Sequence, residues 1–443
     1  MSIAAPSTET SLSPPALKRA FYFIVVLWGE RFRSYFLQFC LASLLSPGNL
    51  PALDPARRSK FLIATRPDDW EAMRRSEAFL RLERYIEPVF LEIPPCPSDS
   101  TAYQHMSIGH RMASEIAHHD SAYAVVLTPD CMLSDGSVAR LQELAQSGVE
   151  LVLTAALRFG EEPFLANLRD MGALPAADHE LDAPLVITGR QMVHAAVNGF
   201  HSETLAYEWD APGLMAISPA AWWRVPGEDG IVLHSLSWAP LLLDYGAIGD
   251  HDTSTFEQWT FDGDYVFNNF KHIERFHVVQ DSDELFIASW GPLTERAVSK
   301  TRFPFDNFLA GHFFRQSFYS GFFDPLKRKL FFLPVRWHAK PLNEKWTVVE
   351  QHAMRELLNW VKPPDEANLA ASVSALQQPQ RFAAAASHFP LSILRTLAYV
   401  WIFRHRIRQY SGRLLRGDRK SLSRVAWFVR SFVFGSSQHS RDL

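Results

Sequence analysis

The stretch from Ala122 to Ser137 constrains the fold more than any other part of the sequence. Its first six residues, AYAVVL, are mostly apolar and too few to cross a membrane, so we expect a strand that is buried on both faces of a parallel sheet. The sequence TPD ends this strand at Asp130, DGS supplies turn and N-cap chemistry from Asp135, and apolar residues then recur at helical spacing. The loops that follow such strands line the ligand crevice of α/β proteins, which makes Asp130 and Asp135 candidate functional residues.

Other apolar stretches extend this pattern on both sides. Strands are predicted at residues 21–28, 60–65, 88–93 and 149–154, with helices at 29–45, 67–84 and 100–119 between them. Five alternations of strand and helix predict a doubly wound, Rossmann-like α/β domain with a mostly parallel sheet. A tight turn at Gly29 suits close approach of the backbone to a nucleotide, so Trp28, Gly29 and Arg66 at strand ends are candidate nucleotide contacts. The sequence contains neither a GxGxxG nor a P-loop motif.

An apolar strand that ends in acids, with a Rossmann-like half before it and a mixed half after it, resembles the nucleotide-sugar glycosyltransferases of the GT-A fold. In that family the strand ends in Asp-x-Asp, which holds a divalent cation against the sugar diphosphate. The triplet here is Asp130-Cys131-Met132, so the second acid is absent and Asp135 is its candidate substitute. The resemblance implies a GT-A-like fold, a nucleotide-sugar donor and a divalent metal, Mn or Mg.

Acids concentrate again between residues 249 and 284. They form the groups Asp250-His251-Asp252, Asp262-Gly263-Asp264 and Asp281-Ser282-Asp283, whose paired acids point the same way in extended backbone and suit a cation or sugar hydroxyls. We predict Asp262 or Asp264, and then Asp252, as the catalytic base that deprotonates the acceptor, and His251 as a metal ligand beside Asp130 and Asp135.

Each of these residues also has a structural interpretation. Asp130 and Asp135 suit turns and helix caps, Asp262-Gly263 is a strong hairpin signal, and an isolated His is more often structural than functional. Further along, His338 and Lys340 faintly resemble a His and Lys pattern of some retaining glycosyltransferases, in which the His binds a metal and the Lys contacts the diphosphate. Lys340 is therefore a candidate diphosphate contact.

The ends of the chain differ from its body. Residues 1–16 are rich in Ser, Thr and Pro and predict a disordered tail without the apolar core of a signal peptide. Residues 391–443 contain ten arginines and one lysine against two aspartates, a formal balance of +9 in a chain of −4. Aromatic residues interleave with these charges, which favours amphipathic helices on an anionic membrane over nucleic acid. Three widely spaced cysteines indicate a reducing cytoplasm.

These patterns predict a nucleotide-binding half at 17–160, a mixed α+β acceptor or catalytic half at 161–362, a linker or helix at 363–390 and a basic helical extension at 391–443. The function expected is transfer of a sugar from a nucleotide-sugar to a glycan or lipid-linked acceptor in bacterial surface polysaccharide assembly, by a cytoplasmic enzyme on the inner face of the membrane. Two alternatives stay open: a metal-dependent hydrolase or phosphotransferase that uses the Asp-rich loops, and a non-catalytic membrane-associated scaffold.

Overall fold

A computed structural model describes the fold at residues 19–95, 101–175, 183–210, 219–257, 259–261, 265–295 and 330–361. The predicted N-terminal tail, the linker and the basic extension lie outside the described residues. So do two further stretches of the sequence, the short apolar run GLMAIS at 213–218 and most of the Phe-rich stretch at 302–333. By contacts the chain divides into two units, Met1–Trp360 and Val361–Leu443, and the architecture below is that of the first unit.

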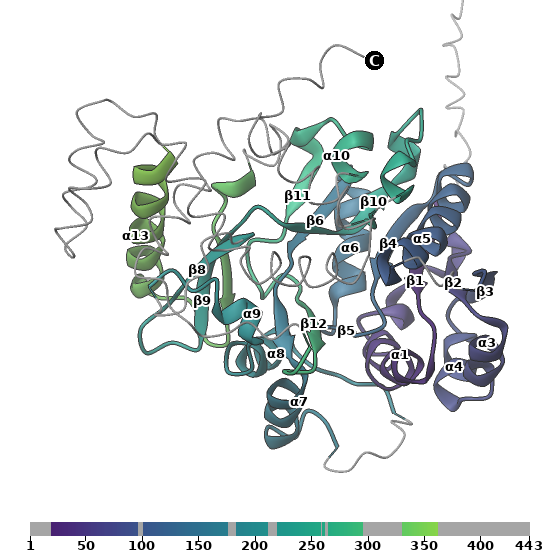
Figure 1. Cartoon of the computed structure of the whole chain (residues 1–443), viewed down its shortest axis with the longest axis horizontal. Helices are drawn as coiled ribbons and strands as arrows, with labels where there is room; N and C mark the ends of the chain where they lie inside the picture. Colours follow the sequence, from purple (N-terminus) through teal and green to yellow (C-terminus); the bar gives the residue numbers. More distant parts are fainter. Residues whose placement is uncertain are drawn as a thin grey trace, which may run out of the picture. The chain divides into compact units, whose positions relative to one another are not determined.

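A seven-stranded, mostly parallel sheet forms the centre of this unit (Figure 1). Its order is β11-β6-β10-β4-β1-β2-β3, and only β10 runs against its neighbours. The strands are β1 (Phe21–Val26), β2 (Lys60–Thr65), β3 (Glu87–Glu92), β4 (Tyr123–Leu127), β6 (Leu151–Ala155), β10 (Trp238–Asp244) and β11 (Phe276–Val278).

The strand order reverses between β1 and β4. From β1 the chain adds β2 and β3 on one side, and it then returns to place β4 on the other side of β1. In open α/β sheets such a switch point opens a crevice at the carboxyl ends of the two strands, which here are followed by Leu27-Trp28-Gly29 and Thr128-Pro129-Asp130.

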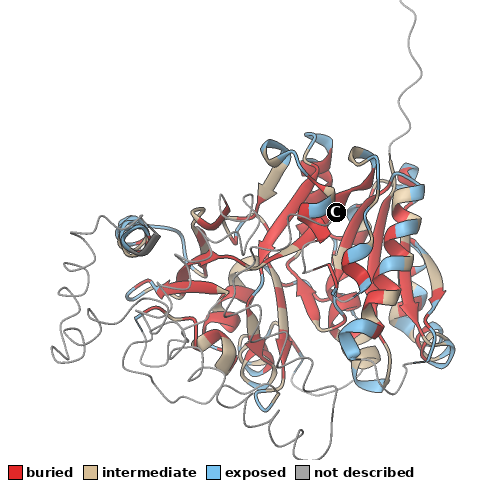
Figure 2. Cartoon of the chain, turned by 45° about the horizontal axis from the view of Figure 1, so that its top comes forward, coloured by how far each residue is buried: buried red, intermediate tan, exposed pale blue. Residues whose placement is uncertain are grey.

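Helices cover both faces of the sheet. Their bounds are α1 (Glu30–Tyr35), the π-helical turn η1 (Phe36–Leu41), α2 (Ala42–Leu44), α3 (Pro67–Arg74), α4 (Glu77–Leu82), α5 (Ala102–His119), α6 (Ser137–Gln146), α7 (Glu161–Asp170), α8 (Gly189–Val197), α9 (Ser202–Leu205), α10 (Tyr265–Asn269) and α13 (Glu344–Val361). Figure 2 shows the strands buried and the outer faces of the helices exposed.

The alternation of side chains along β1 divides the core in two. Phe21, Phe23 and Val25 pack with residues of η1 and α6 in one cluster, whereas Tyr22 and Ile24 pack with residues of α5 in the other. A strand buried on both faces explains the unbroken apolar run in the sequence. The Rossmann-like prediction is consistent with this sheet.

Two small sheets complete the unit. In the first, β5 (Cys131–Leu133) and β7 (Arg158–Gly160) flank β12 (Ile287–Gly291), which places the residues after Asp130 against a distant part of the chain. The second sheet joins β8 (Ala220–Arg224), β9 (Gly230–Ser235) and β13 (Val335–His338). The predicted mixed half is therefore divided between three sheets.

The strand predictions for the first half are confirmed, and β2 has the predicted bounds. The apolar run from Ile231 to Leu243 predicts continuous strand structure, but it forms two strands in different sheets, β9 and β10, separated by a bend at Leu236-Ser237. Within the part of the chain that the structure describes, none of the helices combines the length and the apolar character that crossing a membrane requires.

Candidate functional site

Asp130 lies at the carboxyl end of β4, beside the switch point, and its side chain is half-buried. The backbone carbonyl of Asp130 accepts a hydrogen bond from the N–H of Trp290 in β12, at 3.3 Å, which holds the acidic loop against the small sheet. Burial raises the pKa of the Asp130 carboxyl, although a hydrogen bond from Thr128 and the charges of Arg158 and Arg31 act in the opposite direction. A half-buried acid with a perturbed pKa at a strand end is a candidate functional residue.

Two arginines from different elements lie near this acid. Arg31 comes from the first turn of α1, directly after β1, and Arg158 from β7. Both guanidinium groups contact one carboxylate, since Glu295 accepts from Arg31 at 3.1 Å and from Arg158 at 3.4 Å. The side chain of Glu295 is 39% exposed, so this counter-ion lies at the surface, where an anionic ligand has access to the arginines.

A second polar group lies where β1 and β2 end. His105 of α5 is fully buried, and its ring meets the edge of Trp28 at a centroid distance of 4.7 Å. Neither ring nitrogen of His105 has a hydrogen-bond partner among the described residues, and the same holds for Thr65 Oγ1 and Arg66 Nε. Burial and the charge of Arg66 lower the pKa of His105, so its imidazole is neutral. Buried polar atoms without a partner are uncommon in folded proteins, and these lie together at the carboxyl ends of β1 and β2.

Gly29 has a φ of 82°, which suits glycine, at the start of α1. Its N–H is already used, because it donates to Asp69 Oδ2 at 2.8 Å, and the other oxygen of Asp69 accepts from Arg33 at 2.7 Å. Gly29 therefore shapes the turn between Trp28 and Arg31, while the N–H itself is bound within the protein.

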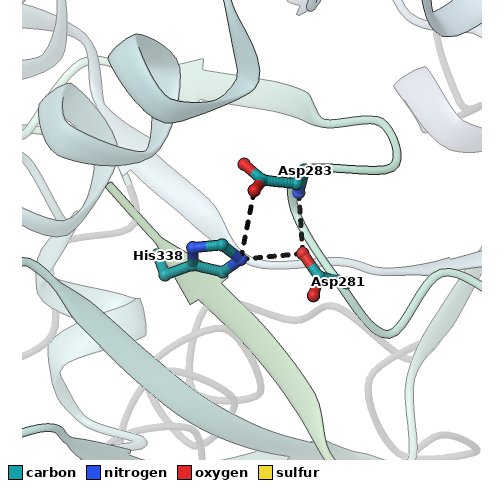
Figure 3. A group of neighbouring side chains, drawn as sticks. All are labelled: Asp281, Asp283 and His338. Atoms are coloured by element: carbon teal, nitrogen blue, oxygen red, sulfur yellow. Dashed lines mark hydrogen bonds and ion pairs between the residues drawn. The ribbon is translucent and has the colours of Figure 1, made fainter. Parts of the chain in front are cut away.

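The carboxyl edge of the sheet also bears a group of metal-ligand type, formed by Asp281, Asp283 and His338 (Figure 3). The two acids follow β11, and His338 ends β13. His338 Nε2 lies 2.7 Å from Asp281 Oδ1 and 4.0 Å from Asp283 Oδ2. Burial lowers the pKa of His338, but the hydrogen bonds with Asp281 and with the carbonyl of Lys340 outweigh it and raise the pKa overall.

Two predicted site residues have other positions and partners. Asp135 Oδ1 accepts the backbone N–H of Gly48 at 2.7 Å and so joins two loops, as its structural interpretation proposes. Lys340 does not join Trp28 and Arg66, because it lies two residues after His338 and its ammonium group is 3.9 Å from Asp229. Neither residue is part of the group around Asp130.

His251 and Asp252 lie at the opposite edge of the sheet from Asp130. Since β10 is antiparallel, its last residue, Asp244, pairs with Tyr123 at the start of β4, and the chain continues from there to α10. Figure 1 shows α10 at one end of the sheet, with α1 and β12 at the other. The structure thus does not bring these two predicted site residues to Asp130.

The surroundings of His251 and Asp252 agree with structural roles. His251 Nε2 lies 2.6 Å from the hydroxyl of Tyr265, and Asp252 Oδ1 accepts the N–H of Ser254 at 2.8 Å. Burial, and then the nearby His118, lower the pKa of His251 to about 4. Asp262 and Asp264 lie outside the described residues, so their predicted role as the base stays a prediction.

Sequence analysis missed Arg31, Arg158, Glu295 and His105. The two arginines were detectable in part, since each lies within a few residues of the end of a predicted strand, where ligand-binding side chains gather. No local signal marks His105 or Glu295. Their roles depend on contacts with residues that are distant in the sequence, such as Trp28 and Arg31.

No protein-family model matches this chain, and no curated protein sequence matches it. The solved structures that this chain resembles include two crystal structures of S. aureus TarS. The one of TarS 1–349 is 7% identical, with 41% of this chain and 56% of that chain covered and a TM-score of 0.21. The other TarS structure is 9% identical, with 41% of this chain and 34% of that chain covered, and its TM-score is also 0.21. The likeness thus spans little more than half of TarS 1–349 and a third of the longer structure, and at this TM-score it carries no argument about function.

Proposed function

We propose that this protein is a nucleotide-sugar-dependent glycosyltransferase whose donor binds at the carboxyl edge of the sheet, between β1 and β4. The observation that supports this most is the pair of guanidinium groups, those of Arg31 and Arg158, that meet on the carboxylate of Glu295 and whose charges oppose the burial-raised pKa of Asp130 at the switch point. Ligands of open α/β sheets bind at this position, and paired arginines suit a diphosphate because each presents several N–H donors in a fixed plane.

The difficult step of glycosyl transfer is departure of the nucleoside diphosphate, on which negative charge develops. Arg31 and Arg158 lie where they would stabilise that charge, and they already share an anionic partner in Glu295. We propose that the diphosphate replaces Glu295 as the counter-ion of both arginines. Exchange of one anion for another avoids leaving either guanidinium without a partner.

The GT-A resemblance implies a divalent cation beside Asp130, and the surroundings of Asp130 do not fit one well. Among the residues that the structure describes, no group of three metal-type ligands includes Asp130, Asp135 or His251. Two guanidinium charges act on Asp130 instead. In the function proposed here, the two arginines supply the positive charge that faces the diphosphate at this position.

The nucleobase of the donor would lie at the ends of β1 and β2. There the partly exposed ring of Trp28 would pack on the base, and displacement of this ring from His105 would give the polar edge of the heterocycle access to the buried nitrogens of His105 and the hydroxyl of Thr65. The acceptor is a glycan or a lipid-linked sugar, with Asp262 or Asp264 as its base, and residues 391–443 attach the enzyme to an anionic membrane. These last assignments extend the sequence predictions.

The test uses the purified full-length protein and a panel of UDP-, GDP- and CMP-sugars, with nucleotide release as the readout. We expect one nucleotide class to be released, and Arg31→Ala and Arg158→Ala each to lower the rate by about 100-fold or more. Arg111→Ala is the matched control, because Arg111 pairs with Glu115 on the exposed side of α5. Equal rates for all three variants, or no binding of any nucleoside diphosphate by calorimetry, would contradict the proposal.

The group of Asp281, Asp283 and His338 favours a second candidate, a metal-dependent hydrolase or phosphotransferase. Such an enzyme would release inorganic phosphate, or transfer it, with a dependence on added divalent cation. Phosphate release from nucleotides, abolished by EDTA and unaffected by Arg158→Ala, would favour this function over glycosyl transfer.

A further inference from the structure

We propose that Asp281, Asp283 and His338 bind one divalent cation of the first transition series, Mn²⁺ or Zn²⁺. The three residues offer one imidazole nitrogen and two carboxylates, and their ligand atoms all lie within 4.8 Å of one another. This site is separate from the group around Asp130, and it does not depend on the function proposed above. Figure 3 shows both carboxylates facing the same nitrogen of His338.

The hydrogen bonds of His338 point to a cation between these groups. Its Nδ1 lies 2.8 Å from the backbone carbonyl of Lys340, and because a carbonyl only accepts, Nδ1 bears the proton. The neutral ring then presents a lone pair at Nε2, which lies 2.7 Å from an oxygen of Asp281. Two lone pairs repel at this distance, so a positively charged species belongs there.

That species is a proton on His338 or a metal ion. His338 is only 2% exposed, so a proton on Nε2 depends on Asp281 for compensation, and a metal ion bound by both side chains would replace that proton. Metal-bound histidines typically donate the second ring N–H to a backbone carbonyl, which fixes the tautomer and the ring orientation. The bond from His338 to Lys340 has this form.

The backbone holds the ligands in place before any ion arrives. Ser282 N–H donates to the carbonyl of Arg336 at 3.0 Å, and Ser282 Oγ accepts the N–H of His338 at 3.0 Å, so the turn between the two acids is joined to β13. A Cβ on Gly189 would lie 2.5 Å from the carbonyl of Ser282, which shows how closely the start of α8 packs on the same turn.

Neighbouring groups support the carboxylates without filling the site. Asp281 Oδ1 accepts the N–H of Asp283 at 2.9 Å, and Arg190 contacts both oxygens of Asp283, at 2.8 and 2.6 Å. The two acids and Arg190 have a net charge of −1, which favours a divalent cation. Asp281 and Asp283 are 36% and 39% exposed, so water reaches the side opposite His338. Three protein ligands and an open side are typical of catalytic rather than structural metal sites.

The types of ligand atom, one imidazole nitrogen and two carboxylates, indicate which metal ions suit the site. Ca²⁺ and Mg²⁺ prefer oxygen ligands alone, whereas an imidazole nitrogen with carboxylates suits Zn²⁺ and Mn²⁺. We therefore expect Mn²⁺ to bind the full-length, EDTA-treated protein with one ion per chain, measured by the loss of the electron paramagnetic resonance signal of free Mn²⁺. Zn²⁺ should displace it, and a large excess of Mg²⁺ should not.

Three variants test the assignment. Asp281→Asn and His338→Gln should each weaken Mn²⁺ binding by at least about tenfold, and Asp283→Asn, at a more exposed position, tests the same ligand set if His338→Gln fails to fold. His194→Gln is the matched control, because His194 also contacts an acid, Asp229, at 3.1 Å, and lies outside the group. Its binding should equal that of the unmodified protein.

Two results would overturn the inference. One is an unmodified protein that binds neither Mn²⁺ nor Zn²⁺, which would leave a protonated His338 as the cation of the group. The other is Mn²⁺ binding that the three variants and the control affect equally, which would place the ion elsewhere. Binding is measured without any sugar donor, so the result is independent of whether the protein transfers glycosyl groups.

Discussion

Arg31 and Glu295 lie 264 positions apart in the sequence, yet Nη2 of the arginine is 3.1 Å from Oε2 of the glutamate. The same carboxylate contacts Arg158, so one acid, four residues after the end of β12, pairs with two arginines and leaves a net charge of +1. Burial raises the pKa of Glu295, but Arg31 and Arg158 outweigh it and lower the pKa overall. An anion that binds here competes with Glu295.

We therefore predict that Glu295→Gln strengthens the binding of nucleoside diphosphates. Removal of the internal counter-ion leaves both guanidinium groups free for the ligand, and we expect about a three- to tenfold lower Kd, or about 1 kcal/mol. Isothermal titration calorimetry with UDP and GDP measures the change. Glu77→Gln is the control, since Glu77 pairs with an arginine, Arg81, on the surface of α4. A weaker or unchanged affinity would show that Glu295 does not compete with the ligand.

His105→Phe should separate ligand binding from stability. Phenylalanine keeps the edge contact with Trp28 and removes two buried nitrogens that have no partner among the described residues. We expect an equal or higher Tm together with about tenfold weaker nucleotide binding. A lower Tm with unchanged nucleotide affinity would instead assign His105 to the core, and thermal unfolding with and without nucleotide distinguishes the two.

His110 makes stability depend on pH. It is buried in α5 against Phe261, at a centroid distance of 4.8 Å, and burial lowers its pKa from 6.5 to about 3. The folded state therefore keeps His110 neutral, while the unfolded state binds a proton below pH 6.5. The contribution of His110 to the free energy of unfolding is therefore complete above pH 6.5. It decreases as the pH falls towards 3, by at most about 1.4 kcal/mol per pH unit.

We predict that His110→Phe reduces this loss. The difference in Tm between pH 7.5 and pH 5 should become smaller in the variant, measured by calorimetry in buffers of matched ionic strength. His119→Phe is the control, because His119 ends the same helix and is exposed. An unchanged pH dependence in His110→Phe would show that other groups cause the acid sensitivity.

Gly109 allows α5 to approach the sheet. A Cβ at this position would lie 2.8 Å from Ala64 Cβ and 2.8 Å from Val26 Cγ1, both on central strands. Alanine improves helix propensity by about 0.5–1 kcal/mol, but overpacking of a core costs about 1–3 kcal/mol, so we expect Gly109→Ala to destabilise the protein. Urea unfolding measures the change, with Glu115→Ala on the exposed side of α5 as the control.

Local patterns were sufficient to predict the five parallel strands of the first half, but not β11, which is also parallel. Runs such as FYFIVV in β1 and KFLIAT in β2 are apolar at nearly every position, because both faces of these strands contact helices. The position of β10 was not predictable in this way. Pro240 lies within β10, where the register shifts, and proline normally argues against a central strand.

The candidate site was less predictable than the fold. Asp130 was identified because its position follows from local sequence, whereas its neighbours come from α1 and β7. Spacing also grouped residues that the fold separates: Asp130 and His251 both lie in acidic loops, and only the direction of β10 decides that they belong to different edges. Conversely, Asp281 and His338 are 57 positions apart and meet at 2.7 Å.

Because β10 is antiparallel, it places two groups of polar residues at opposite edges of the central sheet. By delivering the chain to the far rim, it separates the paired tyrosines and histidines near α10 from the arginines at the switch point by the length of β4, about 16 Å. A small molecule that bound beside His251 would not contact Arg31 or Arg158, where we propose that a donor binds. Ligands at the two ends of β4 should therefore bind at the same time, and the affinity of each should be unchanged by the other.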